Sequence, residues 1–97
     1  MTTLTFEDIL SKGLDLQTAA KIRDISSAFI DEYIHARKEL QHKPMNSTHE
    51  GYAIILEELD ELWDLIKLKN PDKQLMKEEA TQIGAMTLAF ILEVCEE

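Results

Sequence analysis

The segment from Ile83 to Val94 most constrains the fold, because it is apolar on nearly every side of a helix. Its apolar members are Ile83, Ala85, Met86, Leu88, Ala89, Phe90, Ile91, Leu92 and Val94. A helix of this kind must be surrounded by other elements. A chain of 97 residues has few helices with which to surround it. We therefore expect a second copy of the chain, or a dimer of dimers, to supply the missing partners.

Helical periodicity also runs through most of the remaining chain, and no segment alternates with the period of two that marks a strand. A short helix is expected from Thr5 to Gly13, and long helices from Asp15 to Leu40, from Ser47 to Lys69 and from Asn70 to Cys95. The predicted fold is all-α and covers residues 1–97 as a single domain. It is an antiparallel helical bundle of three long helices plus a short N-terminal helix, completed by homo-oligomerisation.

Local signals mark where these helices begin and how closely they pack. Ser47 and Glu50 have the spacing of a capping box. Asn70 is expected to cap the last helix, with Pro71 in its first position, where the missing N–H is harmless. Gly84 lies inside that helix and costs about 1 kcal/mol relative to Ala. We expect it to permit the close approach of another helix.

Composition excludes several classes of partner. Ten Lys and Arg against nineteen Asp and Glu give a net charge of −9, which argues against binding to nucleic acid or to anionic lipid. The apolar stretch near the C-terminus is shorter than the roughly 20 residues that span a bilayer. Glu7 and Asp8 lie where a signal peptide would be basic, and the single cysteine, Cys95, is interpreted as a packing residue. A cytoplasmic location is expected.

The acidic run from Glu57 to Glu61 is the first candidate site. The ordinary interpretation of such a run is a solvated helix face, which suits Asp60 and Asp64. At about 100° per residue, the main core stripe of this helix is expected to contain Tyr52, Ile55, Leu56, Leu59, Leu62, Trp63 and Ile66. Glu58 and Glu61 instead belong to a second apolar stripe, with Glu57 at its edge; its other members are Ile54, Leu65 and Leu68.

The last helix repeats this arrangement. Glu79 and Gln82 lie in a stripe whose other members are apolar, namely Leu75, Met76, Ile83, Met86 and Phe90. Acidic side chains among apolar neighbours are costly unless they are paired or bind a metal. If the two stripes face each other, the acids of both helices converge.

Four converging carboxylates, from Glu57, Glu58, Glu61 and Glu79, would carry a charge of −4, which protonation of one group cannot relieve. Oxygen ligands select hard cations, so Mg²⁺ is favoured, Mn²⁺ is a possible substitute, and two Mg²⁺ would match the charge. A metal-free acid cluster is the alternative. Zinc is disfavoured, since the three histidines are seven residues apart and no cysteine accompanies them. The sequence contains neither a phosphate-binding glycine-rich loop nor a nucleophile-elbow motif.

The run from His49 to Leu62, followed by the segment from Lys77 to Gln82, resembles the MazG-like all-α nucleoside triphosphate pyrophosphohydrolases. The family signature is Glu-Glu-x-x-Glu on one helix and Glu-x-x-Asp on the next. Glu57, Glu58 and Glu61 match its first half. Glu79 matches the start of the second half, and Gln82 stands where the family has Asp. The likeness covers about residues 48 to 95.

The resemblance implies a dimeric or tetrameric bundle that binds Mg²⁺ and hydrolyses a nucleoside triphosphate to its monophosphate and pyrophosphate, in a possible house-cleaning role in the nucleotide pool. By analogy, Glu58, Glu61, Glu79 and Gln82 are metal ligands, and Glu57 and Glu61 are the catalytic candidates that activate water. Gln82 keeps open an alternative, a non-catalytic oligomeric binding or regulatory module. A di-iron bundle would need Glu-x-x-His pairs, which the long helices lack. Lys67, Lys69, Lys73 and Lys77 surround the loop between the last two helices and are interpreted as solvated, with contact of one of them with phosphate as the alternative.

Overall fold

The computed structural model describes residues 5, 7, 8 and 12–96, and three long helices dominate it. They are α2 (Leu16–Ile34), α3 (Thr48–Ile66) and α4 (Lys73–Phe90). A π-helical turn extends α2 (η1, His35–Glu39), and another extends α4 (η2, Ile91–Cys95). No strand occurs among the described residues, so the all-α prediction is confirmed for them.

The short N-terminal helix predicted from Thr5 to Gly13 lies largely outside the described residues. Within them, the Asp8 carboxylate accepts the Thr5 backbone N–H at 3.0 Å, and the Thr5 hydroxyl accepts the Asp8 backbone N–H at 3.1 Å. Gly13 has a φ of 92°, a left-handed conformation that suits the expected helix stop.

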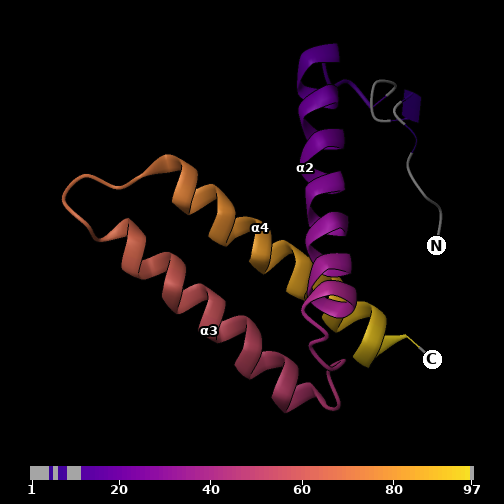
Figure 1. The fold of residues 1–97 in the computed structure, drawn as a ribbon. Helices are drawn as coiled ribbons and strands as arrows, with labels where there is room; N and C mark the ends of the chain where they lie inside the picture. The colour runs from indigo at the N-terminus through magenta and orange to yellow at the C-terminus, as the bar shows by residue number, and fades with distance from the viewer. Residues whose placement is uncertain (1–4, 6, 9–11, 97) are drawn as a thin grey trace.

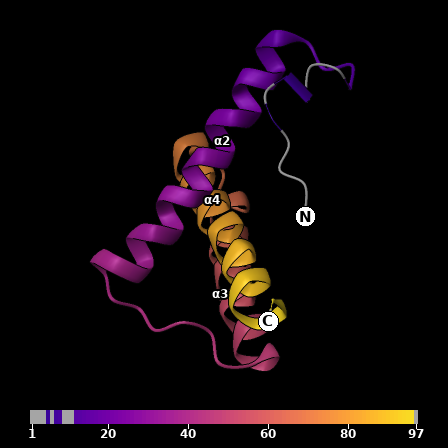
Figure 2. The ribbon, with the colours of Figure 1, turned by 90° about the vertical axis from the view of Figure 1, so that its right-hand side faces the viewer.

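The helices form a hairpin and a crossing helix. α3 and α4 run antiparallel and side by side, and α2 crosses α4 obliquely (Figures 1 and 2). α4 packs against both α2 and α3. The largely apolar helix therefore has the central place, and two of its alanines, Ala85 and Ala89, are fully buried.

The helix starts follow the capping side chains. Ser47 caps α3 as predicted, and its hydroxyl accepts the backbone N–H of Glu50 at 3.1 Å. The prediction that Asn70 caps the last helix was wrong. Asp72 is the cap, because its carboxylate accepts two backbone N–H groups of the first turn, at 2.8 and 3.2 Å. Pro71 therefore precedes α4.

Two glycines allow the helices to approach closely. A Cβ atom on Gly84 would lie 2.6 Å from the ring of Phe29 in α2, which confirms the close approach predicted there. A Cβ atom on Gly51 of α3 would lie 2.5 Å from the ring of Phe90 in α4. Since real Cβ contacts are longer than this, both crossings depend on the missing side chain.

Among the residues that the structure describes, no large side chain is fully buried. The buried apolar residues there are Ala19, Ala36, Met45, Ala85 and Ala89. The radius of gyration is 15.3 Å, against about 12.5 Å for a compact chain of this length.

The main core stripe predicted for α3 was wrong for the single chain. Tyr52 is 66% exposed and Trp63 is 58% exposed, and Leu56, Leu59 and Ile66 are exposed as well. The face of α3 that meets α4 is the neighbouring one, which carries buried Gly51 and half-buried Glu58. α4 thus covers only one side of α3.

None of the described helices has the length and apolar content needed to cross a bilayer.

Candidate metal centre

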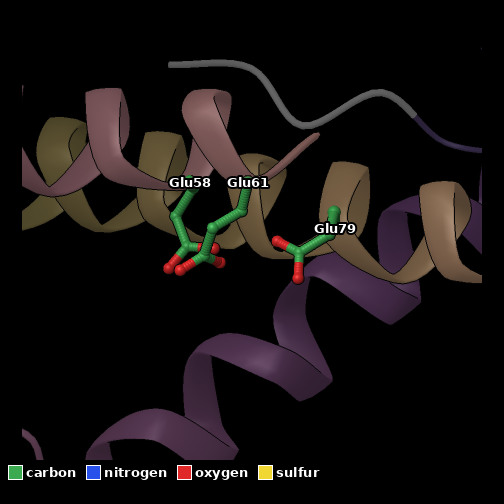
Figure 3. Close-up of side chains that lie close together, drawn as sticks. All are labelled: Glu58, Glu61 and Glu79. Carbon is green, nitrogen blue, oxygen red and sulfur yellow. The ribbon is translucent and has the colours of Figure 1, made fainter. Parts of the chain in front are cut away.

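Three carboxylates from two helices converge beside the α3–α4 contact. Glu58 and Glu61 are one turn apart on α3 and therefore share a face. Glu79 reaches the same place from α4, since that helix runs antiparallel alongside. One carboxylate oxygen from each lies within 4.8 Å of the others. Figure 3 shows the Glu58 and Glu61 carboxylates side by side, with Glu79 pointing toward them.

The environment disfavours the charged form of two of these groups. Burial, followed by the charges of Glu61 and Glu79, raises the pKa of Glu58 from 4.5 to about 7. Burial, followed by the charge of Glu61, also raises the pKa of Glu79. Glu61 is exposed, whereas Glu58 and Glu79 are half-buried, so its charge acts on two carboxylates that are only partly solvated. A proton or a cation bound at the cluster would relieve this repulsion.

Two oxygens of the cluster have no hydrogen-bond partner. Oε2 of Glu58 and Oε2 of Glu79 are inaccessible to water and accept no hydrogen bond. No Lys, Arg or His forms an ion pair with the three carboxylates in the described part of the chain. A buried acceptor without a donor costs about 1–3 kcal/mol, and more when charged. Carboxylate oxygens are the ligands that Mg²⁺ and Mn²⁺ prefer, so this donor set fits a hard divalent cation.

The other two predicted site residues lie outside this group of three. Glu57 is exposed on α3. Gln82 is half-buried on α4, one turn beyond Glu79, and lines the same cavity as Glu58. The predicted convergence therefore holds for Glu58, Glu61 and Glu79. Within the described residues, neither a histidine nor the cysteine joins a metal-ligating group.

A cavity of about 680 Å³ adjoins the cluster at Glu58. η1, the loop between η1 and α3, α3 and α4 all contribute to its wall. Small-molecule sites in proteins typically have volumes of about 300–1,000 Å³. The wall combines apolar side chains such as Ile54 and Met86 with the basic side chains of Lys43 and Lys77. It has room for a ligand of nucleotide size.

A buried ion pair between Arg37 of η1 and Glu93 of η2 holds the part of the cavity wall that η1 forms. Glu93 of η2 accepts two hydrogen bonds from the Arg37 guanidinium, one from the Tyr33 hydroxyl, all at 2.7 Å, and one from the Met45 backbone N–H at 2.9 Å. The hydrogen bonds from Arg37 lower the pKa of Glu93 to about 2. Arg37 also lies over the Tyr33 ring, 5.3 Å from its centre. We call this the Glu93 cluster.

Sequence analysis did not identify the Glu93 cluster or Lys43, and it gave contact with phosphate only as the alternative for Lys77. Tyr33 and Arg37 are four residues apart on one helix, but nothing in the sequence connects them with Glu93, which lies 56 residues beyond Arg37. Lys43 lies in the loop before α3, and the path of that loop depends on the hydrogen bond between Met45 and Glu93.

Comparison with known proteins gives no information on the family or function of this chain. A scan against protein-family models and searches of curated proteins and of solved structures found no match to this chain.

Proposed function

We propose that this chain is a Mg²⁺-dependent nucleoside triphosphate pyrophosphohydrolase that releases a nucleoside monophosphate and pyrophosphate. The convergence of Glu58, Glu61 and Glu79, with two buried oxygens lacking any partner, is the observation that supports it. The adjoining cavity of about 680 Å³ adds a place for the nucleotide. A substrate with several negative charges would otherwise be repelled by a chain with a net charge of −9.

The three carboxylates would hold the cation, and Gln82, one helical turn beyond Glu79, would offer its amide oxygen as a further ligand. Mg²⁺ held there would supply positive charge to offset that of the triphosphate and of the pyrophosphate leaving group. Glu57 or Glu61 would take a proton from the water that attacks the α-phosphorus. Gln82 cannot serve as that base, because an amide does not accept a proton near neutral pH.

The proposal extends to membership of the MazG-like family. Its support is the pairing of Glu-Glu-x-x-Glu on α3 with Glu79 on α4, since the two motif segments lie against each other. Gln82, in place of the family Asp, favours a second candidate, a non-catalytic binding module of the same fold.

The function is tested by incubating the purified chain with Mg²⁺ and a panel of nucleoside triphosphates and measuring pyrophosphate. Stabilisation by Mg²⁺ without release from any nucleotide would favour the binding module.

We further propose that the chain works as a homodimer or homotetramer. Tyr52, Leu56, Leu59, Trp63 and Ile66 recur every three or four residues and form one stripe, the α3 stripe, that stays exposed in the single chain. Five large side chains at this spacing extend over about four helical turns. Monomeric proteins rarely expose a continuous apolar surface of this kind. A second copy would bury it and complete the core that one chain lacks.

Trp63→Glu is expected to weaken self-association by at least about 30-fold, because a buried tryptophan commonly contributes about 2 kcal/mol or more to an interface. Sedimentation equilibrium over a concentration series measures the change. Lys21→Gln, an exposed substitution on α2 that lowers the net charge by the same one unit, is the matched control. An unchanged association constant for Trp63→Glu would show that another surface joins the copies, and a monomeric wild type would refute the oligomer.

A further inference from the structure

We infer that Lys43 and Lys77 bind the phosphate chain of a substrate whose cation is held at Glu58. This inference rests on the proposed function, because it assigns the phosphates to the cavity beside the carboxylate cluster. Lys43 comes from the loop before α3 and Lys77 from α4, and both line the cavity that Glu58 lines. The cavity wall thus has cationic groups and a candidate metal ligand around the same space.

Neither ammonium group forms an ion pair within the described part of the chain. The ion pairs there involve Arg23, His35, Arg37 and Lys67, but not Lys43 or Lys77. What distinguishes these two lysines from the other unpaired ones is that both line the cavity. Glu32 and Glu78 also line the cavity, and the Glu78 carboxylate accepts a hydrogen bond from the Gln74 amide at 3.4 Å. Both ammonium groups therefore remain available to an anionic ligand.

The loop that carries Lys43 is anchored on both sides. Before it, Gln41 has a φ of 56°, and the backbone N–H of His42 donates to the Ala36 carbonyl at 2.9 Å. After it, the Met45 side chain is buried, and its backbone N–H donates to Glu93 at 2.9 Å. A fixed backbone lowers the entropy lost when the Lys43 side chain engages a ligand. Lys77 has an equally fixed backbone, since it lies within α4.

The chemistry of the cavity selects a chain of phosphates. A ligand here must bear negative charge to meet two lysines and must also offer oxygens to a cation at Glu58. A polyphosphate satisfies both demands, because its successive groups can bridge the cation and the ammonium groups. Lysine binds phosphate as a compact point charge and does not require one fixed geometry. Apolar Ile54 and Met86 leave the remaining wall suited to an uncharged part of the ligand.

Inorganic tripolyphosphate, which has no base or sugar, isolates this contact. Calorimetric titration of the full chain with tripolyphosphate and Mg²⁺ should show binding, and the double variant Lys43→Gln/Lys77→Gln should bind about 100-fold more weakly, or about tenfold for each charged contact. Lys43→Arg/Lys77→Arg should retain most of the affinity. Lys21→Gln/Lys69→Gln, two exposed lysines that do not line the cavity, changes the net charge equally and should behave as wild type.

The inference is overturned if wild type does not bind tripolyphosphate, or if Lys43→Gln/Lys77→Gln binds as well as Lys21→Gln/Lys69→Gln. A thermal melt of each variant excludes loss of fold as the cause of weaker binding. The outcome is separate from that of the proposed function. Lysine-dependent binding of tripolyphosphate without pyrophosphate release from any nucleotide would support the phosphate site and reject the enzymatic activity. Pyrophosphate release with a KM that Lys43→Gln/Lys77→Gln leaves unchanged would support the enzymatic activity and reject the phosphate site.

Discussion

Glu58→Gln is expected to reduce Mg²⁺-dependent pyrophosphate release at least about 100-fold and also to raise the melting temperature of the metal-free protein. The loss follows because Glu58 is the most strongly perturbed of the three converging carboxylates and one of its oxygens has no partner. The melting temperature of the metal-free protein should rise because a neutral amide of the same shape removes the repulsion with Glu61 and Glu79. Relief on the order of 1–2 kcal/mol corresponds to several degrees for a domain of this size.

These opposite effects are measured on the same samples. Thermal melts in a chelator and in excess Mg²⁺ give the stability, and pyrophosphate release gives the activity. Wild type should gain stability when Mg²⁺ is added, because a ligand that binds only the folded state stabilises it. Glu58→Gln should lose that gain. Asp60→Asn removes one charge from an exposed position on the same helix and should change neither quantity.

Retention of the Mg²⁺-induced stabilisation by Glu58→Gln would place the cation elsewhere and remove the basis of the enzymatic proposal. Pyrophosphate release that persists in this variant would indicate a different active site or a contaminating enzyme. A metal-free Glu58→Gln protein that melts below wild type would contradict the claim that the cluster is strained without a cation.

The convergence of the carboxylates could be predicted because it depends on two local properties. The period of 3.6 residues places Glu58 and Glu61 on one face of their helix. A short connection makes the next helix antiparallel to it, so Glu79 arrives on the same side. Periodicity also shows that acidic side chains interrupt apolar stripes. These signals lie within the helices themselves and do not depend on distant contacts.

The sequence did not reveal which stripe of α3 faces α4. Periodicity gives the direction of a side chain around its own axis but does not name the partner. The broader stripe, with Tyr52 and Trp63, was the more hydrophobic candidate for the core, yet α4 packs on the side of Gly51. The absence of a side chain at Gly51 admits the Phe90 ring and thereby decides the contact. The Glu93 cluster escaped prediction for a similar reason, since it depends on the tertiary path of the loop.

Glu93→Gln is expected to destabilise the fold at neutral pH by on the order of 3 kcal/mol. The side chains of Arg37 and Glu93 are only 13% and 9% exposed, so the substitution leaves a guanidinium buried beside a neutral amide. Four hydrogen bonds end on this one carboxylate, and an amide has only its single oxygen to accept them. Urea denaturation of wild type and variant measures the difference. Glu96→Gln, an exposed change of equal charge, is the control.

The same carboxylate predicts an acid limb in the stability of wild type. The folded-state pKa of Glu93 is about 2, whereas its ordinary value is 4.5. Its contribution is therefore fully present above pH 4.5 and is lost as the pH falls toward 2, because the unfolded chain binds the proton more readily. Glu93→Gln has no such proton to bind, so its unfolding free energy should fall less steeply over this interval than that of wild type or Glu96→Gln. Parallel acid limbs in all three proteins would show that Glu93 is not held as the structure places it.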